Sequence, residues 1–243
     1  MFRVFEGYHF LIFVVTALLI GLTLFFKRKL TDKQFQLYGK LIGLGLVAHQ
    51  IYFHITHLLI QETYDIKIHL PLHLCGMSIY LVFIAILVDK TFLKNIALTY
   101  SPFGALLAII FPEINNIPFF SFGSFEFFWS HIFILIGVLY LALEPNFKYS
   151  FKQALRFGLA FIPFALLVIY PINVWLGSNY MFLNRLTAEG PMASFPQPPM
   201  HLPVFAVVFV LVSIIQFLCY KKLNQFFKQT YTSLDRDKYK SSI

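Results

Sequence analysis

The chain has 243 residues, of which 58% are hydrophobic and 12% are charged. Soluble domains are usually about 25% charged, so this composition and the mean hydropathy of +0.73 exclude a soluble globular enzyme. The net charge of +8 does not indicate a nucleic-acid partner, because the basic residues lie at the ends of apolar runs rather than in one patch. Apolar runs of about 20 residues recur along the chain and predict a multi-pass membrane protein.

Seven such runs predict an all-α, polytopic bundle of seven transmembrane helices in a single domain. The expected helices cover residues 8–26, 38–60, 69–88, 96–111, 124–143, 154–171 and 202–220. Basic residues follow the first run instead of preceding it, unlike in a signal peptide, so this run is expected to stay and span the membrane. The membrane domain is expected to cover residues 1–230, and residues 231–243 are predicted to form a charged, disordered cytoplasmic tail.

The basic residues also predict the orientation of the bundle. All but three of the 19 Lys and Arg residues fall on one side of the seven expected helices, the exceptions being Arg3, Lys67 and Arg185. Loops rich in Lys and Arg stay in the cytoplasm, so the N-terminus is expected outside and the C-terminus inside a cell membrane. Every histidine except His49 then lies in or near the outer third of the bundle.

The segment 69–77, HLPLHLCGM, gathers two histidines and a cysteine at the mouth of the third apolar run. Pro71 suits the first turn of a helix, so the helix is expected to begin near His69. In that helix His69 and His73 would share a face, whereas Cys75 would lie about 200° from His73. A basic partner that activates the Cys75 thiol therefore has to come from another helix.

His131 is the expected partner, since it lies one to two turns inside the fifth run, at the depth predicted for Cys75. The alternatives without catalysis are that Cys75 is a packing residue and that His131 only forms a hydrogen bond to a neighbouring backbone carbonyl. Glu126 lies about 140° from His131 around the helix, which favours a place at the rim of the site. Asn179 and Tyr180, after the sixth run, could donate to a carbonyl oxygen or a head group, or form an interfacial turn with an aromatic anchor.

A histidine metal site is the alternative chemistry. The pairs His54/His57 and His69/His73 have helical ligand spacing, and zinc accepts imidazole. No H-E-x-x-H sequence is present and no acid adjoins these pairs within the membrane, so no cofactor is expected and zinc is the alternative.

Three motifs in order resemble a known family: HLPLHLCG at residues 69–76, Glu126 with His131, and NYMFL at residues 179–183. Over about residues 8–220 the chain resembles the YwaF-type bacterial integral membrane proteins, which are similar to the eukaryotic transmembrane protein 164 family. Members of that family are described as cysteine-dependent acyltransferases that remodel ether phospholipids. The resemblance implies that Cys75 matches the acyl-accepting cysteine, His131 the catalytic histidine, and residues 179–180 the Asn-Tyr motif.

The leading hypothesis is an integral membrane acyltransferase or acyl hydrolase that acts on a membrane phospholipid near the outer face. A thioester would form on Cys75 with His131 as the base. The residues expected to bind substrate or an oxyanion are His69, His73, Glu126, Asn179 and Tyr180. The alternatives are a transporter or ligand-binding protein with a histidine-lined cavity, and a metal hydrolase. The sequence does not define the lipid, the acyl acceptor or the oligomeric state.

Overall fold

The protein folds into helices over the residues that the computed structural model describes, which are 4–112, 118–144, 147–186 and 191–240, and these ranges contain no β-strand. The helical elements are α1 (Gly7–Lys29), α2 (Asp32–Ile55), η1 (Thr56–Ile60), α3 (Leu74–Val88), α4 (Thr91–Ile110), α5 (Phe122–Leu143), α6 (Phe151–Phe164), η2 (Ala165–Ile169), α7 (Tyr170–Leu176), η3 (Tyr180–Phe182), η4 (Pro191–Ser194) and α8 (His201–Lys240). Six helices are long and apolar enough to cross a membrane, and α3 is a shorter apolar helix. The prediction of an all-α, multi-pass membrane protein is therefore confirmed.

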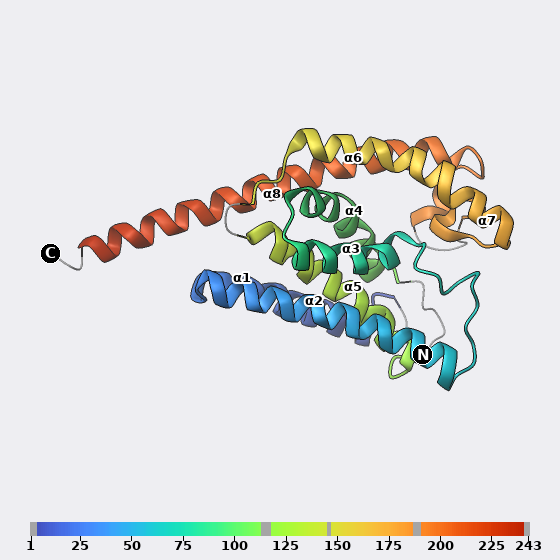
Figure 1. The fold of residues 1–243 in the computed structure, drawn as a ribbon, viewed down its shortest axis with the longest axis horizontal. Helices are drawn as coiled ribbons and strands as arrows, with labels where there is room; N and C mark the ends of the chain where they lie inside the picture. Colours follow the sequence, from blue (N-terminus) through green and yellow to red (C-terminus); the bar gives the residue numbers. More distant parts are fainter. Residues whose placement is uncertain (1–3, 113–117, 145–146, 187–190, 241–243) are drawn as a thin grey trace.

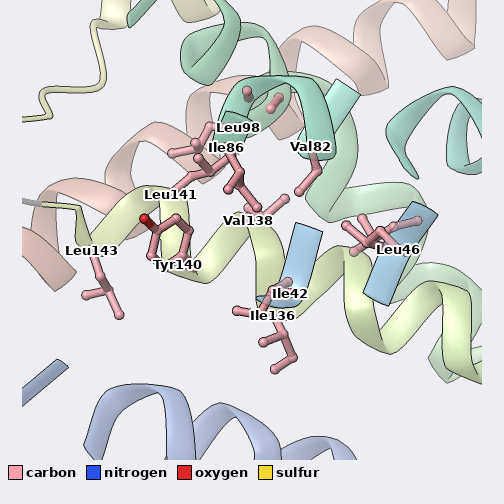
Figure 2. Close-up of a cluster of buried hydrophobic side chains, with 14 of the residues drawn as sticks. Ile42, Leu46, Val82, Ile86, Leu98, Ile136, Val138, Tyr140, Leu141 and Leu143 are labelled. Atoms are coloured by element: carbon pink, nitrogen blue, oxygen red, sulfur yellow. The ribbon is translucent and has the colours of Figure 1, made fainter. Parts of the chain in front are cut away.

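Helices α2, α3, α4 and α5 form the centre of the molecule, with α3 enclosed by the other three (Figure 1). α1 packs on α5, whereas α6 and α8 pack against each other and against α4. The core lies where α2, α3 and α5 meet, and its fully buried side chains include Leu46, Val82 and Leu141 (Figure 2). α8 continues past the bundle as a single helix to Lys240 (Figure 1).

Glycines let three of these helices approach closely and thereby fix their register. A Cβ atom on Gly137 of α5 would lie 2.5 Å from a methyl carbon of Val82 in α3. A Cβ on Gly39 of α2 would lie 2.0 Å from the ring of Tyr140 in α5. Both separations are shorter than real carbon contacts, so a larger residue at 39 or 137 would force the Tyr140 ring or the Val82 side chain to move.

The two ends of the bundle differ in content, and we name them by their residues. The cysteine end is where η1 ends and α3 and α5 begin, together with α7 and η3. The lysine end is the opposite end, where α3 and α5 finish and α4 begins at Thr91. Figure 1 shows the cysteine end on the right, where the irregular segment 61–73 connects the end of η1 to α3.

α3 begins at Leu74 rather than near His69, so the expected start of the third helix was wrong. Pro71 lies in a turn before the helix, and His73 is the N-cap residue with an extended backbone (φ −71°, ψ 151°). At 1.5 Å per residue the 15 residues of α3 span about 22 Å, less than the roughly 30 Å of a bilayer core.

Several other helices are longer than expected, and two of them have identifiable reasons. α2 begins at Asp32 rather than near residue 38, because Thr31 and Gln34 form a reciprocal capping box. The sixth helix continues to Leu176 instead of ending near residue 171. Pro163 lacks an amide hydrogen, and the helix takes up this defect as the π-turn η2 before going on as α7.

The predicted tail begins inside α8, which is helical as far as Lys240. Residues 241–243, like Arg3 at the other end, lie outside the described residues. The division into a membrane domain of residues 1–230 and a tail of residues 231–243 stays a prediction.

Candidate functional site

Cys75 lies in the first turn of α3, partly buried and packed against the hydrophobic core. A Cβ on Gly104 of α4 would lie 3.2 Å from the Cys75 sulfur, so this glycine makes room for the thiol. A Cβ on Gly76 would lie 3.0 Å from Cα of Pro71, so the turn before the helix folds over its first residues. The first N–H groups of α3 have no acceptor within the helix and favour a negative charge near the thiol.

His131 is a buried residue of α5 whose hydrogen bond fixes its tautomer. Its Nδ1 lies 2.5 Å from the carbonyl oxygen of Phe127. Because a carbonyl can only accept, Nδ1 carries the hydrogen, and Nε2 of the neutral ring keeps its lone pair. The hydrogen bond to a neighbouring carbonyl, which the sequence offered as the alternative to catalysis, is therefore present. It involves only Nδ1, so Nε2 is still available as a base.

Cys75 and His131 lie at the same level of the bundle. α3 and α5 run in the same direction and meet where Val82 packs beside Gly137 (Figure 1). Cys75 precedes Val82 by seven residues and His131 precedes Gly137 by six, so each lies about 10 Å from this contact toward the cysteine end. No hydrogen bond joins the thiol to the imidazole among the described residues, where the polar partners of His131 are Phe127 and Ser130.

His73, at the N-cap of α3, has the opposite tautomer to His131. The backbone N–H of Met181 donates to Nδ1 of His73 at 3.3 Å, so the hydrogen of the neutral ring is on Nε2. The ring contacts Tyr180 and Phe182, with centroids 5.2 Å and 5.4 Å away. His73 therefore presents a neutral N–H donor beside the first turn of α3.

The Asn-Tyr motif ties loops together at the cysteine end. Tyr180 is fully buried, and its hydroxyl accepts from the backbone N–H of Leu70 at 3.1 Å and donates to the carbonyl of Ile66. Burial raises the pKa of Tyr180, which keeps the phenol neutral. Asn179 instead accepts from the backbone N–H of Arg185 at 2.9 Å and closes its own loop. Both side chains hold the segment next to His73, and an oxyanion role for either stays a prediction.

Asn173 of α7 is a residue that the sequence analysis missed. Its buried amide donates to the Tyr180 carbonyl at 2.9 Å, and its Oδ1 accepts from the Tyr180 N–H at 2.7 Å and from Ser178 at 2.8 Å. An asparagine inside an apolar run was the available signal, because a buried amide needs partners. Asn173 holds the loop that contacts His73.

Glu126 belongs to a second group of polar side chains, nearer the tip of the cysteine end. Its carboxylate lies 3.9 Å from Nε2 of His57, and the rings of His57 and His69 stack with centroids 4.3 Å apart. Nδ1 of His69 accepts from the backbone N–H of Asp65 at 2.8 Å. His54, in turn, lies with its Nε2 3.0 Å from the Gln50 amide nitrogen. Glu126 therefore faces His57 and not His131.

The two histidines proposed as a zinc pair, His69 and His73, are separated in the structure. His69 stacks on His57, whereas His73 contacts Tyr180. Within the described ranges, no group of three or more His, Cys, Asp or Glu residues could hold a metal ion. Zinc binding by residues 54, 57, 69 and 73 stays a prediction, without a three-ligand site in this part of the chain.

The fold and this site define a class of protein: a multi-pass helical membrane protein with a cysteine and several histidines gathered at one end of the bundle. The model of the TMEM164 family matches residues 4–220, and the chain belongs to this family. The resemblance to transmembrane protein 164 is thereby confirmed, whereas the YwaF-type designation stays a prediction. Comparisons with curated proteins and with solved structures find no match.

Proposed function

We propose that this protein is an integral membrane lipid acyltransferase or acyl hydrolase that works through a thioester on Cys75, with His131 as the base. The observation that carries the proposal is the hydrogen bond from Nδ1 of His131 to the Phe127 carbonyl. It leaves an unprotonated Nε2 at the level of Cys75, which is what a thiol needs in order to become a nucleophile in apolar surroundings.

In the first half-reaction the Cys75 thiol gives its proton to Nε2 of His131, and the sulfur bonds to the carbonyl carbon of a phospholipid ester. The carbon–oxygen bond breaks, and the lysophospholipid oxygen takes the proton from His131. In the second half-reaction an alcohol or water gives its proton to His131 and bonds to the thioester carbon. The carbon–sulfur bond breaks, and the Cys75 sulfur takes the proton back.

Two sets of donors support the negative oxygen that forms in each half-reaction. The N–H groups of the first turn of α3 are unpaired within the helix. The Nε2–H of His73 follows from the bond that its Nδ1 accepts from Met181. Donors of this kind are most effective where water is excluded, because they need no rearrangement when the charge appears.

The proposal includes the finer topology. α3 serves as the seventh span, with the segment 61–73 completing its depth, since irregular backbone is tolerated at membrane depth when protein surrounds it. The bias of Lys and Arg then places the N-terminus outside, the C-terminus in the cytoplasm and the cysteine end at the outer face of the cell membrane. A site in the first turn of α3 would lie near the ester groups of the outer leaflet.

The test uses purified full-length protein in lipid bilayers and a phospholipid with a reporter acyl chain. Intact mass should show one acyl adduct on the wild type that hydroxylamine removes, and none on Cys75→Ala. The matched control is Cys219→Ala, because Cys219 is also a free thiol but is exposed on α8. An adduct that persists in Cys75→Ala would overturn the proposal.

A second function, the binding or transport of a ligand, is favoured by the stacked rings of His57 and His69 beside Glu126. This function predicts pH-dependent uptake or binding that requires His57 and survives Cys75→Ala. If His57→Gln retains uptake or binding at the wild-type level, this second function is ruled out.

A further inference from the structure

His49 of α2 is a buried polar residue whose hydrogen-bonding groups are unused. Its residue surface is 6% exposed, and neither ring nitrogen makes a hydrogen bond of ordinary geometry among the described residues, although the backbone of Glu126 lies near the ring. A buried polar group left without a partner costs about 1–3 kcal/mol. His9 of α1 shows the usual solution, because its Nδ1 accepts from Phe5 N–H at 2.8 Å and its Nε2 donates to the Ile109 carbonyl at 2.7 Å.

The register of α2 against α5 brings His49 to the level of the thiol. The two helices run in opposite directions and meet at Gly39 with Tyr140 and at Gly45 with Phe133. Four residues beyond Gly45, His49 faces about residue 129 or 130 of α5, which is within about 3 Å of His131 along the axis. His49 is also within electrostatic range of His131. It therefore approaches His131 from α2, whereas Cys75 belongs to α3.

We propose that His49 binds the hydroxyl group of the acyl acceptor and holds it against His131 for the second half-reaction. This inference rests on the proposed function. A hydroxyl oxygen has one hydrogen to give and lone pairs that accept. Its hydrogen points to Nε2 of His131, while an N–H of the neutral His49 ring donates to the oxygen.

The proton balance of this step is simple. The acceptor oxygen bonds to the thioester carbon, and its proton passes to His131 and from there to the departing sulfur of Cys75. His49 keeps its own proton throughout, so it binds and orients the acceptor without acting as a base. The hydroxyl can belong to a lysophospholipid or to water, and the two sources make the protein a transferase or a hydrolase.

The experiment separates the two half-reactions on the full-length protein in bilayers. The thioester is first formed from reporter phospholipid, and its decay is followed by intact mass with and without added lysophospholipid. His49→Leu should form the adduct at a rate within about twofold of wild type but release it about 10- to 100-fold more slowly, as expected for a lost hydrogen bond. His49→Gln, which retains an N–H donor, should recover part of the release rate. A defect confined to the arm with lysophospholipid identifies a lipid alcohol, and a defect without it identifies water.

A stability measurement distinguishes binding from a structural role. His49→Leu removes an unpaired polar group, so the Tm without substrate should stay the same or rise. The matched control His9→Leu deletes two hydrogen bonds and should lower the Tm while leaving the ratio of the two half-reaction rates unchanged. Release by His49→Leu at the wild-type rate overturns the inference, and so does an equal loss of both half-reactions with a lowered Tm. If wild type forms no Cys75 adduct, the proposed function itself fails and the inference falls with it.

Discussion

The two ends of the bundle treat buried polar groups in opposite ways. At the lysine end, Lys94 is 5% exposed and its ammonium group contacts the carboxylates of both Asp89 and Glu144. At the cysteine end, within the described residues, neither nitrogen of His49 makes a hydrogen bond of ordinary geometry, and His73 uses only one of its two ring nitrogens. The chain satisfies its own charges at one end and leaves donors and acceptors open at the other. Open groups in an apolar medium indicate where something other than the chain is to be bound.

Most neutral polar residues of the lysine end follow the same pattern as its charges, the exception being Gln153, whose Oε1 has no partner among the described residues. Asn95 donates to the carbonyl of Thr91 and accepts from the N–H of Ser150 at 3.0 Å. Thr99 shares a 2.8 Å hydrogen bond with the hydroxyl of Tyr149. Each bond joins α4 to itself or to the segment before α6, so these groups stabilise the fold and are not free for chemistry.

The largest effect should come from the base of the site. His131→Gln removes the Nε2 lone pair, and we expect the rate of Cys75 acylation to fall on the order of 10²- to 10⁴-fold. Adduct formation by intact mass measures the change, with the Tm as a control for folding. Acylation at the wild-type rate would show that the Cys75 thiol is activated by another residue.

Breaking the charge cluster of the lysine end should cost stability instead of activity. Lys94→Met leaves the buried Glu144 carboxylate without its partner, and we expect the free energy of unfolding to drop by about 3–5 kcal/mol. The double variant Lys94→Met with Glu144→Leu should recover most of this loss, because the only carboxylate then left unpaired is that of Asp89, which is exposed to solvent. Denaturation in detergent measures both, and acylation per folded molecule should match wild type. If acylation falls by more than the fraction of folded protein does, the lysine end contributes to activity, and the contrast between the two ends is wrong.

The tie between α7 and η3 should give an intermediate effect on both properties. Asn173→Ala deletes the bonds to both backbone groups of Tyr180, and we expect a loss of about 1–3 kcal/mol in the free energy of unfolding. Because Tyr180 precedes the residue that bonds His73, acylation should also fall, by about tenfold. Thr16 is a useful comparison, since Thr16→Val removes only a bond within α1. Equal effects of the two variants would argue against a special role for Asn173.

The smallest effect is expected at the tip of the cysteine end. Glu126 and His57 are partly exposed and 3.9 Å apart, so Glu126→Gln should change the free energy of unfolding by about 0–1 kcal/mol. Acylation should stay within about threefold of wild type if the thiol works through His131. A loss comparable to that of His131→Gln would move the catalytic base to the Glu126 group.

Local patterns predicted what depends on local physics. Apolar runs gave most of the helices, and the topology that followed from their order put Cys75 and His131 at one level. The start of α3 depended on more than its own sequence, because Pro71 suits either a first turn or the turn before it. The choice is tied to the hydroxyl of Tyr180, more than 100 residues away, which holds Leu70 and Ile66 outside the helix.

The same reason explains the side-chain groupings that the sequence did not predict. His69 and His73 would have shared a face only in a helix that includes both, and that helix does not form. The stack of His69 on His57 and the partners of Glu126 arise where separate elements meet. Whether the ring nitrogens of His49 form hydrogen bonds depends on the helices that surround α2. The sequence alone shows a histidine in an apolar run at both residue 49 and residue 9, and it does not indicate that only His9 is hydrogen-bonded.

The shortness of α3 has a consequence for how such a protein would be assayed. In the proposed topology α3 covers about 22 Å of a bilayer core of roughly 30 Å, so its first turn would lie within about 8 Å of the outer ester groups. A lipid would meet the thiol by lateral diffusion, with its chains still among their neighbours, and would not have to be extracted into water. The quantity that sets the rate is then the mole fraction of the substrate in the membrane. Adding inert lipid at constant total substrate would slow turnover, whereas diluting the vesicles in buffer would not.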